Sequence, residues 1–94
     1  MATMTRDRIK SGDDACKFVD QRASDSGCHV AWRQNGSHRV GKVVEEDTGR
    51  HRGSLVVPMH GEVRRGTLSS ILRMMARIGL LVAALVTGYA WVVG

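Results

Sequence analysis

The stretch Asn35-Gly36-Ser37-His38-Arg39-Val40 divides the middle of the chain into two predicted strands. Asn-Gly is the strongest short signal for a β-hairpin, because a type I′ turn needs a positive φ at both central positions. Before it, Val30 and Trp32 alternate with Ala31 and Arg33, and this period of two is expected of a strand. After it, residues 37–44 form the predicted return strand, with His38 and Lys42 on one face and Arg39 on the other.

A second stretch, Val57-Pro58-Met59-His60, marks the end of a third strand over residues 55–57. Proline lacks the N–H that a sheet ladder needs, so Pro58 ends this strand. The predicted loop between the second and third strands covers residues 45–53. Further along, Thr67 is the expected N-cap of a helix. The apolar residues of that helix recur at the spacing of one helical face: Leu68, Ile71, Leu72 and Met75.

The region before the hairpin has the pattern of a short amphipathic helix. Ser11 is a suitable N-cap, acidic residues follow it, and Gly27 suits a left-handed C-terminal position. Its apolar residues are Ala15, Cys16, Phe18, Val19 and Ala23. The expected order is helix, strand, strand, strand, helix. This order predicts a small α+β domain with a three-stranded antiparallel sheet and both helices on one face.

The length of 94 residues fits one small domain with tails. Residues 1–11 are expected to form a flexible N-terminal tail, 12–79 the folded domain, and 80–94 a hydrophobic tail. Residues 78–94 carry no charge, and their length is close to the lower limit of about 17 residues for a spanning helix. A membrane segment and a buried terminal segment, packed in the domain or in an oligomer, are both open readings.

The formal net charge is +5, and residues 28–66 hold seven basic against four acidic side chains. Such an excess favours a polyanionic partner, since binding phosphates releases counterions. A merely soluble basic surface is the alternative reading. The two cysteines form no Cys-x-x-Cys pair and the N-terminus lacks an apolar run, which favours synthesis in the cytoplasm. No cofactor and no metal site is expected, since the adjacent Cys28 and His29 point to opposite strand faces.

Three stretches in this order resemble the HicA family of bacterial toxins. They are Gly36-Ser37-His38, Val57-Pro58-Met59-His60 and Gly66-Thr67-Leu68-Ser69-Ser70-Ile71-Leu72-Arg73. The resemblance covers roughly residues 12–79. It implies a fold like the double-stranded-RNA-binding domain, endoribonuclease activity on mRNA, and a HicB-like antitoxin as protein partner. It also implies that His38 is the catalytic residue. Arg39 stands where family members often carry a second histidine or an aromatic residue.

The residue types around His38 suit RNA cleavage without a metal. Histidine can take the proton of a 2′-hydroxyl, and cations can hold the phosphate as charge builds on its oxygens. The candidate RNA-binding residues are Arg33, Ser37, Arg39, Lys42, Arg64 and Arg65. His60 is a candidate second acid or base, and a residue that only shapes its loop is the alternative reading. His29 and His51 belong to no motif and are expected to be ordinary surface residues. The run Arg50-His51-Arg52 is expected to be a solvated basic loop, with contact to the RNA backbone as an open possibility.

Two hypotheses of different classes follow. The first is a HicA-like toxin of a type II toxin–antitoxin system, located in the cytoplasm, that binds and cleaves mRNA through His38. The second is a non-catalytic, membrane-tethered relative of that fold, which binds RNA or a partner. In the second, residues 78–94 contact the inner membrane and Arg73 and Arg77 hold the domain in the cytoplasm. A weaker third reading makes the apolar tail itself toxic to membranes.

Overall fold

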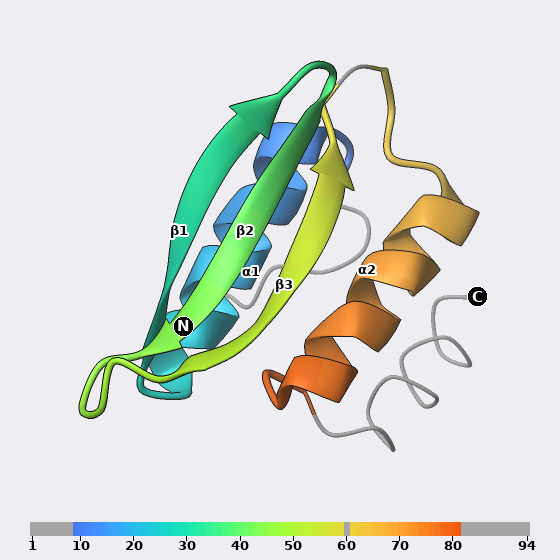
Figure 1. The fold of residues 1–94 in the computed structure, drawn as a ribbon. Coiled ribbons are helices and arrows are strands. Elements are labelled where there is room, and N and C mark those ends of the chain that lie inside the picture. The colour runs from blue at the N-terminus through green and yellow to red at the C-terminus, as the bar shows by residue number, and fades with distance from the viewer. Residues whose placement is uncertain (1–8, 60, 82–94) are drawn as a thin grey trace.

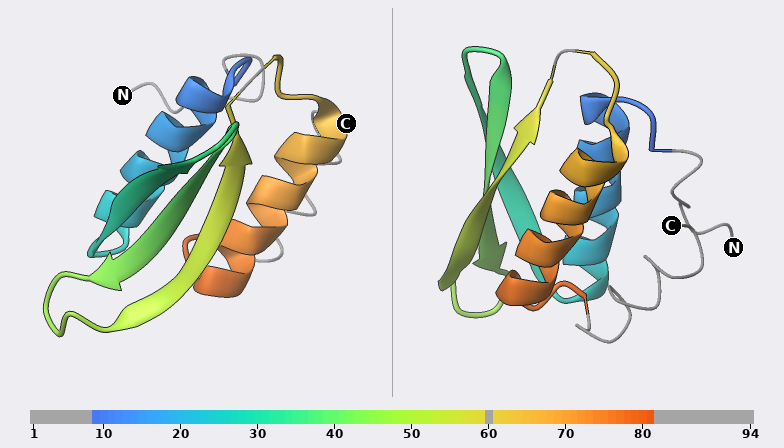
Figure 2. Two further views of the ribbon diagram at one scale, coloured as in Figure 1. Left: turned by 45° about the horizontal axis from the view of Figure 1, so that its top comes forward. Right: turned by 90° about the vertical axis from the view of Figure 1, so that its right-hand side faces the viewer.

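The computed structural model of the chain describes residues 9–59 and 61–81. The elements are α1 (Gly12–Asp25), β1 (Cys28–Asn35), β2 (His38–Glu45), β3 (His51–Pro58) and α2 (Arg65–Ile78). The strands form one antiparallel sheet in the order β1-β2-β3 (Figure 1). Both helices cover the same face of the sheet, and the opposite face carries no element of the described chain (Figure 2). The predicted α+β architecture is therefore confirmed.

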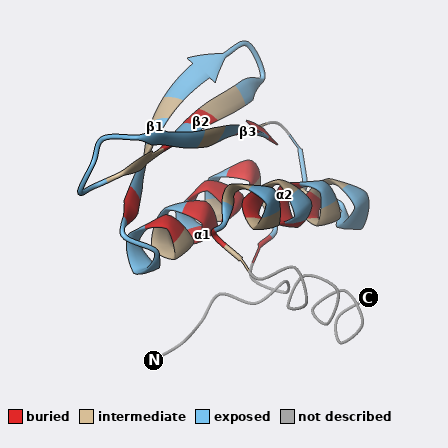
Figure 3. Cartoon of the chain, turned by 60° about the horizontal axis from the view of Figure 1, so that its bottom comes forward, coloured by how far each residue is buried: buried red, intermediate tan, exposed pale blue. Residues whose placement is uncertain are grey.

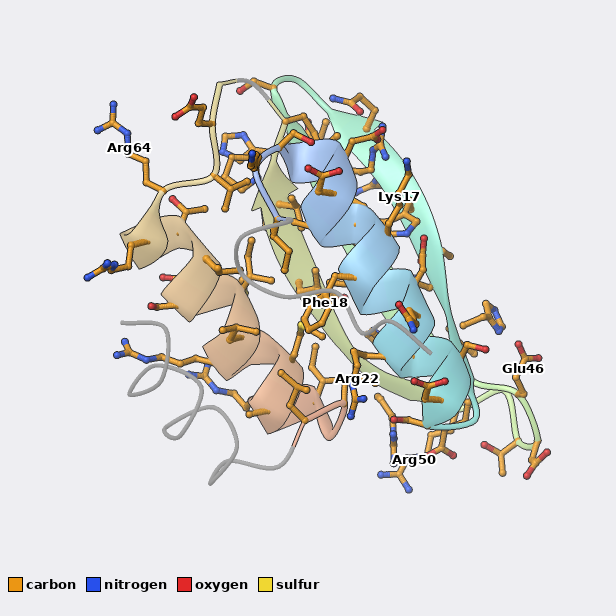
Figure 4. All side chains as sticks on the ribbon, turned by 180° about the vertical axis from the view of Figure 1, so that it is seen from behind. Lys17, Phe18, Arg22, Glu46, Arg50 and Arg64 are labelled. Atoms are coloured by element: carbon orange, nitrogen blue, oxygen red, sulfur yellow. The ribbon has the colours of Figure 1, made fainter. Side chains whose placement is uncertain are left out.

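The core lies between the sheet and the two helices (Figure 3). Val43, Leu55 and Val57 face the helices from the sheet, and all three are at most 1% exposed. The apolar faces predicted for the two helices are confirmed, since every one of those residues is buried: Ala15, Cys16, Phe18, Val19, Ala23, Leu68, Ile71, Leu72 and Met75. Phe18 points from α1 toward α2 (Figure 4), and side chains of both helices belong to one core cluster.

Both predicted ends of α1 are confirmed. The N–H of Asp14 donates to Ser11 Oγ at 3.1 Å, and the Asp14 carboxylate accepts from the N–H of Ser11 at 3.2 Å. This reciprocal pair is a capping box, which satisfies N–H groups that the first helical turn leaves free. A further bond from the N–H of Lys10 holds the pKa of the Asp14 carboxyl below its ordinary value. Gly27, just past the helix, has a φ of 73°.

The turn between β1 and β2 lies one residue later than predicted. Asn35 pairs with His38, so the two-residue loop consists of Gly36 and Ser37. Gly36 has a φ of 63°, whereas no other residue type among those described has a positive φ. Glycine alone at the first central position is the arrangement of a type II′ turn. The predicted type I′ turn centred on Asn35 and Gly36 is wrong, and His38 becomes the first residue of β2.

Two further predicted boundaries are wrong. The third strand begins at His51 instead of residue 55, because pairing continues past the loop: the N–H of Glu45 donates to the Arg50 carbonyl at 2.9 Å. The second helix has Arg64 at its N-cap position instead of Thr67. Here the N–H of Val63 donates to the Lys10 carbonyl at 2.9 Å, which fixes the chain just before the helix. Local sequence patterns cannot predict a contact between residues as far apart as Lys10 and Val63.

Residues at both ends of the described chain belong to the packed domain. Ile9 is buried, and Ser11 forms a β-bridge with Glu62, although the sequence assigns both to the N-terminal tail. Leu80 is 1% exposed, although the sequence assigns it to the hydrophobic tail. Residues 82–94, which carry most of the membrane hypothesis, lie outside the described residues. Within the described part, no helix has the length and hydropathy that crossing a membrane requires.

Gly12 joins the start of α1 tightly to the end of β3. A Cβ atom at this position would overlap the Pro58 carbonyl oxygen and would lie 2.9 Å from Met59 Sδ. We expect Gly12→Ala to lower the free energy of unfolding by about 1–3 kcal/mol, because the backbone must shift to relieve the overlap. Urea unfolding followed by circular dichroism measures the change.

Gly66 provides the matched control for this prediction. It lies in the first turn of α2, and a Cβ there would meet no atom within 4 Å. Gly66→Ala is expected to leave stability unchanged or slightly increased, since alanine favours helix more than glycine does. Equal losses of stability in the two variants would contradict the tight contact at Gly12.

Candidate nucleic-acid interface

The side of the sheet that faces away from the helices is a continuous exposed surface, which we call the open face. Side chains alternate along each strand, so the strand register fixes the members of this surface. They are His29, Ala31, Arg33 and Asn35 of β1, His38, Val40, Lys42 and Val44 of β2, and His51, Ser54, Val56 and Pro58 of β3. None of them is acidic.

His38 is exposed at one end of this surface and is fixed by pairing on both sides. It is paired with Asn35 across the turn and with Pro58 of β3. Its Nδ1 lies 3.4 Å from Ser37 Oγ, and the Ser37 carbonyl accepts a 2.8 Å hydrogen bond from the N–H of Met59. The two motifs that stand about twenty residues apart in the sequence are therefore side by side.

Arg33 and Lys42 supply the cations of the open face. Arg33 is directly opposite Val40 in the register, so it is the diagonal neighbour of both His38 and Lys42. Diagonal positions on adjacent strands are within reach of long side chains. In the part of the chain that the structure describes, neither cation forms an ion pair. Both are exposed: Arg33 is available to an anion beside His38, and Lys42 to an anion further along β2.

The other predicted binding residues lie elsewhere. Arg39 faces the helix side, where its Nη1 lies 3.6 Å from Asp13 Oδ1 and its Nε donates to Gln34 Oε1 at 3.5 Å. Arg64 and Arg65 are exposed at the start of α2, and Arg64 points away from the body of the domain (Figure 4). His60 lies outside the described residues. The structure thus groups Ser37 and His38 with Arg33 and Lys42, and leaves the other three arginines apart from them.

Two histidines outside the motifs of the resemblance share the open face with His38. His29 Nδ1 lies 2.9 Å from Glu46 Oε1 at the edge of the surface. His51 Nε2 lies 3.2 Å from Ser54 Oγ within β3. His51 could not be placed from the sequence, because the predicted third strand began four residues too late. Its position follows from the pairing of His51 with Val44, which includes the bulge between Val43 and Val44.

No acidic residue of the described chain belongs to the open face, although Glu46 contacts His29 at its edge. Four are on α1, namely Asp13, Asp14, Asp20 and Asp25. Glu45, Glu46 and Asp47 lie at the end of β2 and in the following loop, and Glu62 precedes α2. The open face therefore carries two cations, three histidines and no carboxylate, while the other basic residues of the described chain lie on the helices, in the loops and on the helix side of the sheet. Among the described residues, no cluster of histidine, cysteine and acidic side chains has the spacing to hold a metal ion.

Comparisons of the chain with protein-family models, with curated proteins and with solved structures give no match.

Proposed function

We propose that this protein is an RNA-cleaving toxin of the HicA type, with His38 as its catalytic base. The observation that supports the proposal best is the setting of His38, which is exposed, held by strand pairing on both sides, and diagonal to Arg33. A side chain placed on rigid strands keeps its position relative to a bound phosphate, which general base catalysis requires. The three motifs of the resemblance provide the second line of support.

The proposed reaction uses the RNA's own 2′-hydroxyl as the nucleophile. His38 removes the proton of this hydroxyl, and the oxygen attacks the adjacent phosphorus. A 2′,3′-cyclic phosphate forms, and the bond to the 5′-oxygen of the next nucleotide breaks. Arg33 stabilises the charge that develops on the phosphate oxygens. The departing 5′-oxygen takes a proton from water or from His60, the candidate second acid.

A protein partner that inhibits this activity would have to cover His38. In the HicA resemblance this partner is a HicB-like antitoxin, and mRNA is the substrate. Since Ser37 and His38 stand at a protruding turn, a partner that occupies this end of the sheet would exclude RNA from the base. The charge of the open face predicts an acidic contact surface on such a partner.

Induced expression of the full chain tests the proposal in cells. We expect growth arrest together with fragmentation of total RNA for the intact chain, and neither for His38→Ala. The matched control is His29→Ala, which removes a histidine from the far end of the same face. Growth arrest with intact RNA, or equal RNA fragmentation by the His38→Ala chain, would refute the proposed function.

A further inference from the structure

The open face extends well beyond His38. Strands rise about 3.3 Å per residue, so from His38 to Val44 the surface runs about 20 Å along β2. Four imidazole or guanidinium side chains stand on it, those of His29, Arg33, His38 and His51, and the ring of His29 is engaged with Glu46. Between them lie valines, of which Val56 is 41% exposed. This surface is larger than the turn at which the proposed chemistry takes place.

We propose that single-stranded RNA lies along the open face from His38 and Arg33, over Lys42 of β2, to His51 of β3. His29 contacts Glu46 at the outer edge of β1 and lies outside this path. The choice of RNA as the ligand rests on the proposed function, whereas the location rests on the charge of the surface. Lys42 lies midway along β2 and is free to contact a phosphate. Imidazole and guanidinium planes can stack on unpaired bases, and apolar side chains can cover base faces between them.

The same side chains are poorly suited to a duplex. In double-stranded RNA the base faces are stacked inside the helix, so proteins recognise it through phosphates and 2′-hydroxyls. The planar groups and valines of the open face would then have no partner, and Arg33 and Lys42 would be the only cations on it. The exposed surface of α1 offers no alternative, since Asp13 and Asp20 lie about one helical turn before and after its exposed Lys17.

His51 defines the far end of this RNA path. Its ring is restrained by the contact with Ser54 Oγ at 3.2 Å, and a restrained ring loses less conformational freedom when a base stacks on it. Ser54 is paired with Lys42 across the strands, so the histidine, the hydroxyl and the ammonium group lie on neighbouring positions. We expect His51→Ala to weaken RNA binding about threefold to tenfold. This corresponds to the loss of one base–side-chain stacking interaction, at the lower end of the usual range of stacking free energies.

The test measures binding by the full chain carrying His38→Ala, so that the RNA stays intact. Fluorescence anisotropy reports binding of a labelled ten-nucleotide RNA, alone or annealed to its complement. Lys42→Glu is expected to weaken single-strand binding at least about tenfold, because it replaces a phosphate contact by a repulsive charge. Lys17→Glu is the matched control, since it makes the same charge change on exposed α1. It should alter binding by less than about twofold.

Three outcomes would overturn the inference: equal losses from Lys42→Glu and Lys17→Glu, binding of the duplex as tight as that of the single strand, or no binding. The experiment is independent of catalysis. If His38 proves unnecessary for cleavage while Lys42→Glu still abolishes single-strand binding, the proposed reaction fails and the binding surface stands. If cleavage depends on His38 but Lys42→Glu leaves RNA binding unchanged, the proposed reaction stands and the proposed binding surface fails.

Discussion

His38→Ala is expected to lower the rate of RNA cleavage by the purified full chain about 100- to 10,000-fold, the usual contribution of a positioned general base. The loss should lie in the chemical step, because alanine leaves Arg33 and Lys42 in place to hold the RNA backbone. Since His38 is exposed and its backbone pairs with Asn35 and Pro58 whatever its side chain, the fold should persist. Gel analysis of a labelled RNA gives the rates.

The control for this experiment is His29→Ala, whose rate should stay within about threefold of that of the parent chain. His29 lies at the opposite end of β1 and contacts Glu46 instead of the turn. Thermal unfolding of both variants should match the parent, since exposed substitutions usually change stability by less than about 0.5 kcal/mol. Cleavage by the His38→Ala protein at the parental rate would remove His38 from the reaction.

Leu55→Ala is expected to lower the free energy of unfolding by about 2–5 kcal/mol. Leu55 is 1% exposed at the centre of the core, and alanine would leave a cavity between the sheet and the helices. A small domain has only about 5–15 kcal/mol of stability in total, so this variant should be largely unfolded under mild denaturing conditions.

Val56→Ala is the neighbouring control in the same strand. Its side chain is 41% exposed on the open face, so truncation removes few contacts and should cost less than about 1 kcal/mol. Urea titration followed by circular dichroism measures the free energy of unfolding of both variants. Similar losses for the two variants would mean that β3 does not present Leu55 to the core, and the assignment of the open face would then fail as well.

The hydrophobic periodicity predicted every element of the domain, because each helix and strand buries one regular face. The capping residues Ser11 and Gly27 also predicted the two ends of α1. The starts of β3 and α2 could not be predicted, because the bond from Glu45 to Arg50 and the contact of Val63 with Lys10 set them. The latter contact joins segments more than fifty residues apart.

The candidate site was predictable to the extent that it depends on alternation within one strand. His38 and Lys42 lie on one face of β2 whatever the register. The position of Arg33 depends on the turn: a loop centred on Asn35 and Gly36 would have placed it directly opposite His38, whereas the observed loop places it opposite Val40. His51 belongs to the surface because β3 begins at His51. The residues before the strand contain no signal from which this early start could be predicted.

The central claim is that His38 activates a 2′-hydroxyl of RNA. The most direct test maps the bond that the full chain cuts in a short RNA, and then presents the same RNA with a single 2′-deoxynucleotide on the 5′ side of that bond. The account predicts that this bond is no longer cut, and that the unmodified RNA yields a product ending in a 2′,3′-cyclic phosphate. Cleavage of the deoxy-substituted RNA at the same bond would contradict it, since the proposed nucleophile would be absent.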